Sequence, residues 1–201
     1  MCKYKSAIVV RDEKRKGGFR LLVSPWTESH SELCQIFNLN DSATAKLYFA
    51  RVEFSPDSLE TAHLVETYKF KLDEERTPEW WDPEIRERVI DQLKTYIQSI
   101  IVVRKVDLLI GGQFILGPGA DVGTLKYCTV TAMLDSAKVG TMWGSAKVGT
   151  MRDSANVGEM WGSANVGTMR DSAKVGEMWD SAKVGTMWDS AKVENDTQTN
   201  P

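Results

Sequence analysis

Residues 135–193 read DSAKVGTMW GSAKVGTMR DSANVGEMW GSANVGTMR DSAKVGEMW DSAKVGTMW DSAKV, a nine-residue phrase repeated six times and then truncated. A short fixed period is typical of a solenoid, in which each repeat packs only against its neighbours. Ala137 and Val139 flank Lys138, which is the alternation of a strand with its apolar face inward. A helical repeat is disfavoured, because a glycine in every copy would cost each helix about 1 kcal/mol.

The other places in the phrase are also fixed. Gly140 is expected to bend the strand, and Met142 to turn inward after it, where a flexible thioether fills irregular gaps. Asp135 and Gly144, which begin successive copies, suit the corners between strands.

A period of eighteen residues is superimposed on the period of nine. Trp143, Trp161 and Trp179 are eighteen residues apart, and Arg152 and Arg170 fall midway between them. The sequence therefore predicts coils of eighteen residues, each made of two halves and each rising by about 4.8 Å. One corner then carries a column of tryptophans, and the opposite corner carries the two arginines.

The tryptophan column has two interpretations. Stacked indoles tie neighbouring coils together, contributing roughly 0.5–1.5 kcal/mol per pair beyond burial. Aromatic side chains exposed in a row are also typical of contact surfaces. We take as candidate partner-binding residues of the solenoid Trp143, Trp161, Trp179, Trp188, Arg152, Arg170, Glu159 and Glu177.

Decayed copies of the phrase precede the regular ones. Cys128, Thr129 and Val130 match Ala137, Lys138 and Val139, and residues 121–125 (DVGTL) form a further copy that is one residue out of step. We therefore predict a β-solenoid over residues 112–193. A small α+β domain is expected over residues 1–111 and a disordered polar tail over residues 194–201.

The N-terminal domain is predicted from its periodicity. Strands are expected over residues 4–11, 19–23, 46–54, 66–72 and 106–110, and helices over residues 28–37 and 83–102. Asp82 is the expected N-cap of the second helix and Pro83 its first residue. Trp80 and Trp81, just before this helix, are either a hydrophobic anchor or a second binding hot spot.

Motifs for catalysis or ligand binding are weak. His30 and Cys34 are four residues apart, but no second pair of metal ligands accompanies them, so no metal site is expected. The segments Gly111-Gly112 and Gly117-Pro118-Gly119 do not form a nucleotide-binding pattern. The chain has only two histidines and no nucleophile with an evident base. We therefore expect a protein that is not an enzyme and uses no cofactor.

Composition points to a protein of the cytoplasm. The chain has three scattered cysteines, no apolar run long enough to span a membrane and no signal-peptide core at its start. Its net charge is −3, and residues 135–193 hold seven basic and seven acidic side chains. This balance argues against direct nucleic-acid binding, which favours a clearly basic surface.

The repeat D/G-S-A-x-V-x-x-M/V-W/R resembles repeats at the C-termini of small proteins of bacteriophages, prophages and gut bacteria. Those proteins are similar in having a short α+β part with a P-x-W-[WF] motif, here Pro78 to Trp81, although this part of the likeness is weaker. The resemblance implies a mobile-element origin and a non-enzymatic role. Small phage proteins of this kind often inhibit host factors, including CRISPR–Cas and other defence complexes.

The repeats and the composition suggest three functions for comparison. The leading expectation is a non-catalytic protein that binds a host protein or protein–nucleic-acid complex through the solenoid. The alternative is self-assembly, as a homodimer formed through the solenoid ends or the tryptophan corner. Ice binding is disfavoured, because Thr150, Thr168 and Thr186 form only a single file.

Overall fold

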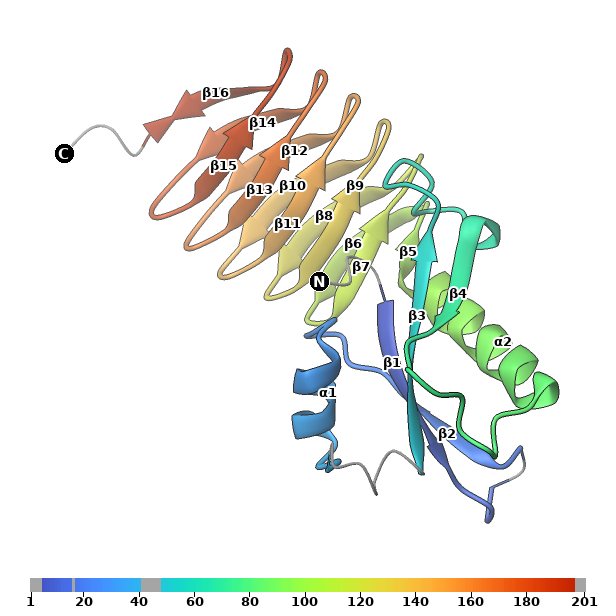
Figure 1. The fold of residues 1–201 in the computed structure, drawn as a ribbon. Coiled ribbons are helices and arrows are strands. Elements are labelled where there is room, and N and C mark those ends of the chain that lie inside the picture. The colour runs from blue at the N-terminus through green and yellow to red at the C-terminus, as the bar shows by residue number, and fades with distance from the viewer. Residues whose placement is uncertain (1–4, 16, 41–47, 198–201) are drawn as a thin grey trace. The chain divides into compact units, whose positions relative to one another are not determined.

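The eighteen-residue period shapes the C-terminal part of the chain, which winds into a β-solenoid (Figure 1). The computed structural model describes residues 5–15, 17–40 and 48–197. The chain divides into two compact units, with the boundary between Ser99 and Ile100. The first unit is a small α+β domain, and the second forms about five coils of eighteen residues over residues 101–196, which confirms the predicted fold class.

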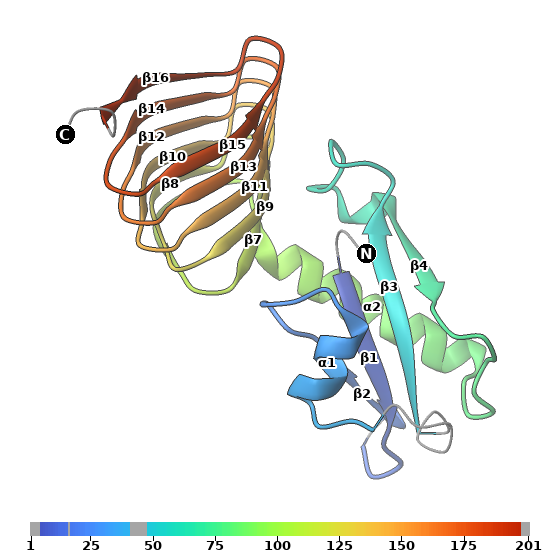
Figure 2. The same ribbon diagram turned by 60° about the vertical axis from the view of Figure 1, so that its left-hand side comes forward.

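Each coil gives one strand to each of two parallel sheets, and Figure 2 shows these sheets facing each other. The first sheet contains β6 (Lys105–Ile110), β8 (Asp121–Lys126), β10 (Lys138–Trp143), β12 (Asn156–Met160), β14 (Lys174–Met178) and β16 (Lys192–Asp196). The second contains β5 (Ile101–Val102), β7 (Gln113–Leu116), β9 (Thr129–Met133), β11 (Lys147–Met151), β13 (Asn165–Met169) and β15 (Lys183–Met187).

The core between the sheets is built from columns of identical residues. Val139 pairs with Val157 and Met142 with Met160, and all four side chains are buried. Alanines at the corners, such as Ala155, complete the interior. The inward placement predicted for Ala137, Val139 and Met142 is therefore confirmed, and the same residue type meets itself in successive coils.

The glycines in the strands allow the coils to approach closely. A Cβ atom on Gly158 would lie 2.6 Å from the carbonyl oxygen of Gly140 in the preceding coil. The same close approach recurs in the other sheet, where a Cβ on Gly167 would lie 2.7 Å from the Gly149 oxygen. The phrase therefore needs a glycine here to let neighbouring backbones pass.

We expect Gly158→Ala to destabilise the solenoid by about 1–3 kcal/mol, because the added methyl group must push two backbones apart. Thermal unfolding of this variant measures the effect, and Thr168→Ala, a change at the outer surface of β13, serves as the control. A melting temperature equal to that of Thr168→Ala would contradict the close approach.

The corners use left-handed backbone at the first residue of each copy. Asp135, Asp153 and Asp171 have φ values of 56–58°, and Gly144 and Gly162 have 66° and 70°. Glycine adopts this region freely and aspartate tolerates it better than most residues, which explains why only these two types alternate here. The predicted corner role of these residues is confirmed.

The solenoid begins before residue 112, where the sequence placed its start. β6 pairs with β8 through Val106↔Val122 and Leu109↔Leu125, so the strand assigned to the first domain is the first strand of this solenoid sheet. The helix expected to reach residue 102 ends at Ile100, and Ile101–Val102 forms β5. A run of β-branched residues from Ile100 to Val103 favours this switch to strand. Residues 194–196, assigned to the tail, belong to β16.

The first unit is built around a four-stranded antiparallel sheet of order β2-β1-β3-β4. Its strands are β1 (Lys5–Arg11), β2 (Phe19–Leu22), β3 (Phe49–Pro56) and β4 (Tyr68–Leu72), and its helices are α1 (His30–Ile36) and α2 (Pro83–Ile100). A short 3-10 helix, Val65–Thr67, precedes β4. The first residue of the expected strand over 4–11, and residues 46–47 of that over 46–54, lie outside the described residues.

Both faces of this sheet are covered, with α1 and α2 on opposite sides (Figures 1 and 2). Ile8 and Val10 of β1 pack with Leu33 and Cys34 of α1, while Ala7 and Val9, on the other face, are also buried. The predicted cap of α2 is confirmed, because Asp82 Oδ1 accepts a hydrogen bond from the Ile85 amide at 2.7 Å. Ser29 caps α1 in the same way.

Candidate functional site

The tryptophan corner lies at the C-terminal ends of β10, β12 and β14. The indoles of Trp143 and Trp161 stack with ring centroids 6.0 Å apart and planes 12° apart. Those of Trp161 and Trp179 are closer, at 4.9 Å and 6°. Trp143 is 48% exposed, and the other two are half-buried. The structure therefore brings the three predicted tryptophans into one column, which we call the Trp column.

Acidic side chains fix the orientation of two of these indoles. Trp161 Nε1 donates to Glu159 at 2.9 Å, and Trp179 Nε1 donates to Glu177 at 3.2 Å. The coil of Trp143 has Thr141 in the place of these glutamates. Trp161 and Trp179, the two indoles hydrogen-bonded to glutamates, are also the more closely stacked pair. The column is therefore a rigid aromatic strip with carboxylates beside two of its three indoles.

Tyr127 is a further exposed aromatic residue beside this corner, and it was not predicted from the sequence. A Cβ on Gly144 would lie 2.3 Å from the Tyr127 ring, so this ring covers the glycine next to Trp143. Tyr127 has a φ of 53° and is 54% exposed. The sequence feature that could have indicated Tyr127 is its position just before Cys128, which begins a decayed copy of the repeat. That copy differs too much from the regular ones to be aligned by residue identity alone.

The opposite corner carries an arginine in two successive coils and a tryptophan in the last one. Arg152 Nε lies 3.4 Å from Asp171 Oδ2 of the next coil, whereas Arg170 is exposed. Trp188 replaces arginine in the final coil and is 56% exposed. The predicted arginines and Trp188 thus share this corner, separate from the Trp column.

Aspartates of one coil bind the backbone of the coil before it. Asp171 Oδ2 accepts from the Asp153 amide at 3.2 Å, and Asp180 Oδ2 accepts from the Gly162 amide at 3.0 Å. These carboxylates therefore hold corners together. Their role in the structure explains their recurrence without any ligand.

An open polar groove crosses the first sheet near the arginine corner, with a volume of about 480 Å³. It is lined by Lys138, Ser154, Asn156, Ser172 and Lys174. Its residues are the outward lysine or asparagine of each copy and the corner serines. The groove therefore follows from the repeat itself, because the same places of successive copies line it.

Trp80 and Trp81 form a second aromatic cluster in the first unit. Their rings meet edge to face at 5.7 Å, and Trp81 stacks on Phe70 of β4 at 6.1 Å. The Arg86 guanidinium lies 5.4 Å from the Phe70 ring. Both tryptophans are half-buried, and their contacts anchor the segment before α2 to the sheet.

Both ring nitrogens of His30 lie close to oxygen atoms of other elements. Its Nδ1 lies 3.3 Å from Asp73 Oδ2, and its Nε2 lies 3.1 Å from the Val52 carbonyl oxygen. Ligand atoms of His30, Glu53 and Asp73 lie within 4.8 Å of one another, as the ligands of a metal would. However, the Lys71 ammonium already bonds Asp73 at 2.7 Å and lies 3.6 Å from Glu53. The hydrogen bond from Lys71 lowers the pKa of Asp73.

A buried ion pair at the start of β1 was also missed. The side chain of Lys5 is fully buried, and its Nζ bonds Glu28 at 2.8 Å and the Ser24 carbonyl oxygen at 2.7 Å. The Ser6 amide donates to the other Glu28 oxygen at 2.7 Å. Burial lowers the pKa of Lys5, although Glu28 opposes this shift. Strand alternation could have shown that Lys5 faces the same way as buried Ala7, but not that Glu28 meets it.

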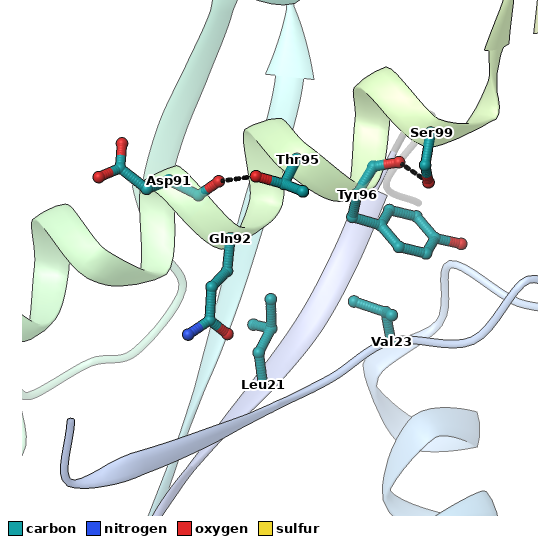
Figure 3. A pocket seen from close by; sticks show the side chains of 7 residues that line it. All are labelled: Leu21, Val23, Asp91, Gln92, Thr95, Tyr96 and Ser99. Atoms are coloured by element: carbon teal, nitrogen blue, oxygen red, sulfur yellow. Dashed lines mark hydrogen bonds between the residues drawn. The ribbon is translucent and has the colours of Figure 1, made fainter. Parts of the chain in front are cut away.

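A groove of about 460 Å³ lies between β2 and α2 (Figure 3). Leu21 and Val23 lie beneath the helix and Tyr96 lies above them. The rest of the lining is polar and comes from the helix: Asp91, Gln92, Thr95 and Ser99. Thr95 and Ser99 use their hydroxyls to donate to carbonyl oxygens of the helix itself. A ligand site needs a few polar groups that converge on the ligand. These hydroxyls do not converge on the groove.

No helix within the described residues is long and apolar enough to cross a membrane. Comparison of the chain with protein-family models, with curated proteins and with solved structures gives no match.

Proposed function

We propose that this is a non-catalytic binding protein whose solenoid presents the Trp column to a protein partner. The observation that carries the proposal is the column itself: three indoles in register, two of them pinned by carboxylates, at an accessible corner. Tryptophan is enriched among residues that dominate binding energy. Side chains that are already ordered lose little entropy when a partner binds.

The charge around the column favours a protein over a nucleic acid. Glu159 and Glu177 lie directly beside the indoles, where they would repel phosphates. The same carboxylates can receive a basic side chain of a protein that packs on the rings. The complementary surface is therefore an apolar patch flanked by lysine or arginine.

The resemblance of the repeats to those of phage and prophage proteins extends this proposal to the identity of the partner. A host factor or a defence complex such as CRISPR–Cas, met in the cytoplasm of the host cell, is the partner class that it favours. The likeness of the repeats is the observation that supports this part of the proposal.

The test is affinity capture from host lysate with tagged wild-type protein and two corner variants. Trp161→Ala removes the central ring and is expected to weaken capture of the main partner about 30-fold, the loss typical of a hot-spot residue. Arg170→Ala, at the opposite corner, is the matched control and should capture normally. Circular dichroism shows whether both variants keep the solenoid.

Equal capture by wild-type protein and a folded Trp161→Ala variant would rule out the Trp column as the docking surface. Loss of capture by Arg170→Ala alone would move the surface to the other corner.

A further inference from the structure

The solenoid ends on an open face. β15 and β16 are the last strands of their sheets, and within residues 48–197 no strand pairs with their outer edges. Met187 is 49% exposed, whereas Met169, its counterpart one coil earlier, is fully buried. Exposed edges of this kind are templates for pairing with another chain.

The backbone at this edge is arranged around Val193. The Lys192 amide donates to the Ala173 carbonyl oxygen at 3.1 Å, so Lys192 faces the preceding coil. Successive residues of a strand in a parallel sheet bond to opposite sides, which points the amide and carbonyl of Val193 outward. The Val193 side chain packs against the end of the solenoid core. Pairing at this residue would continue both the sheet and the core.

The residues beside Val193 make the edge complementary to itself. Lys192 and Glu194 form an ion pair at 3.1 Å, so their side chains lie on the same face of the strand. If two β16 strands run antiparallel about a two-fold axis at Val193, each Lys192 lies opposite the Glu194 of the other copy. The two valines then exchange two backbone hydrogen bonds, as residues directly opposite each other do in antiparallel pairs.

We propose that a second copy of this chain closes the open end, with the two β16 strands antiparallel about Val193. A two-fold contact of this kind is closed and does not propagate into fibres. Addition of a further coil in the parallel sense would instead place lysine opposite Lys192, as Lys174 already is within the chain. The charge pattern therefore favours a second copy in the antiparallel sense.

The size of the end face sets the expected strength. Two strands with their corners present a face of about 25 by 20 Å, given the rise per residue and the spacing between packed sheets. Two such faces bury about 1,000 Å² in total, which is at the lower limit for specific interfaces. The dimer is thus expected to be concentration-dependent, with dissociation in the micromolar range.

Charge exchange at the two flanking residues tests this arrangement in the full chain. Lys192→Glu and Glu194→Lys each place like charges opposite each other, and each should raise the dissociation constant about 30-fold. The double variant, Lys192→Glu with Glu194→Lys, restores both pairs and should dimerise as the wild type does. Lys138→Glu, in the same column three coils away, is the control. Sedimentation velocity over a range of concentrations gives the mass of each species.

Mixing the two single variants is the decisive measurement. The two-fold arrangement predicts that they form a heterodimer, because every pair across the axis is then of opposite charge, whereas neither forms a homodimer at the same concentration. A wild-type chain that stays monomeric, or a mixture that does, would overturn the proposal. Trp161→Ala should still dimerise, so failure of the proposed function leaves this result unchanged.

Discussion

Glu28→Gln is expected to destabilise the first unit by about 3 kcal/mol. The carboxylate of Glu28 accepts from both Lys5 Nζ and the Ser6 amide, while a glutamine offers one oxygen to these two donors. Lys5 would keep its buried charge and lose its counter-charge. Removing one partner of a buried ion pair costs about 3–5 kcal/mol, and the partial exposure of Glu28 places this case at the lower limit. Thermal or urea unfolding measures the loss.

The pH dependence of the variant separates this cause from a general packing defect. The pKa of Lys5 is lower in the folded chain than in the unfolded chain, so between the two values the unfolded chain binds more protons. Stability therefore rises with pH across that window and is lower below it. Loss of Glu28 removes an interaction that raises the pKa of Lys5 in the folded chain. The pH range over which stability rises therefore extends to lower pH, and the total gain in stability towards alkaline pH increases.

A double variant, Lys5→Met with Glu28→Gln, provides the control. It removes the buried charge as well as its partner and should recover much of the lost stability and abolish the added pH dependence. If Glu28→Gln unfolds with the wild-type midpoint at neutral pH, the ion pair is not a significant contributor.

Met160→Ala should destabilise the middle of the solenoid by about 3 kcal/mol. Met160 is fully buried and stacks in register between Met142 and Met178. Truncation of a buried methionine costs about 2–5 kcal/mol, because transfer energy is lost and a cavity remains. The neighbouring coils hold the walls of this cavity in place, which limits collapse. Amide hydrogen exchange in β10, β12 and β14 measures the change locally.

Met187→Ala is the matched control for this variant. Met187 occupies the same place in the phrase, but it is half-exposed at the last coil. In dilute solution its truncation should cost less than about 1 kcal/mol, since little buried surface is lost. Equal losses of hydrogen-exchange protection in Met160→Ala and Met187→Ala would mean that the methionine columns do not belong to one continuous core.

The structure of the regular copies could be predicted from the sequence because each structural role is filled by its own residue type. Inward Val157 and Met160, and corner residues such as Asp153, recur at fixed spacing, and the two-sheet coil follows from them. The Trp column follows from the longer period. The structure adds the pinning of Trp161 by Glu159, which depends on side-chain rotamers that spacing does not determine.

The start of the solenoid and the ion pair at Lys5 were not predictable in this way. β6 (KVDLLI) is recognised as the counterpart of β8 only from the backbone pairing of the two strands, because its residues no longer match the nine-residue phrase. Lys5 and Glu28 are twenty-three residues apart and meet only once the first sheet has formed. Local periodicity reports which face a residue occupies, but long-range pairing decides what that residue touches.

The two-half coil has a consequence for how this protein can change in length. A gain or loss of eighteen residues inserts or removes a whole coil and leaves every column aligned. A gain or loss of nine residues would instead place arginine next to tryptophan in each column. It would also move every later strand from one sheet to the other. The valency of the aromatic strip can therefore be adjusted by one indole at a time, in axial increments of about 4.8 Å, without alteration of either end.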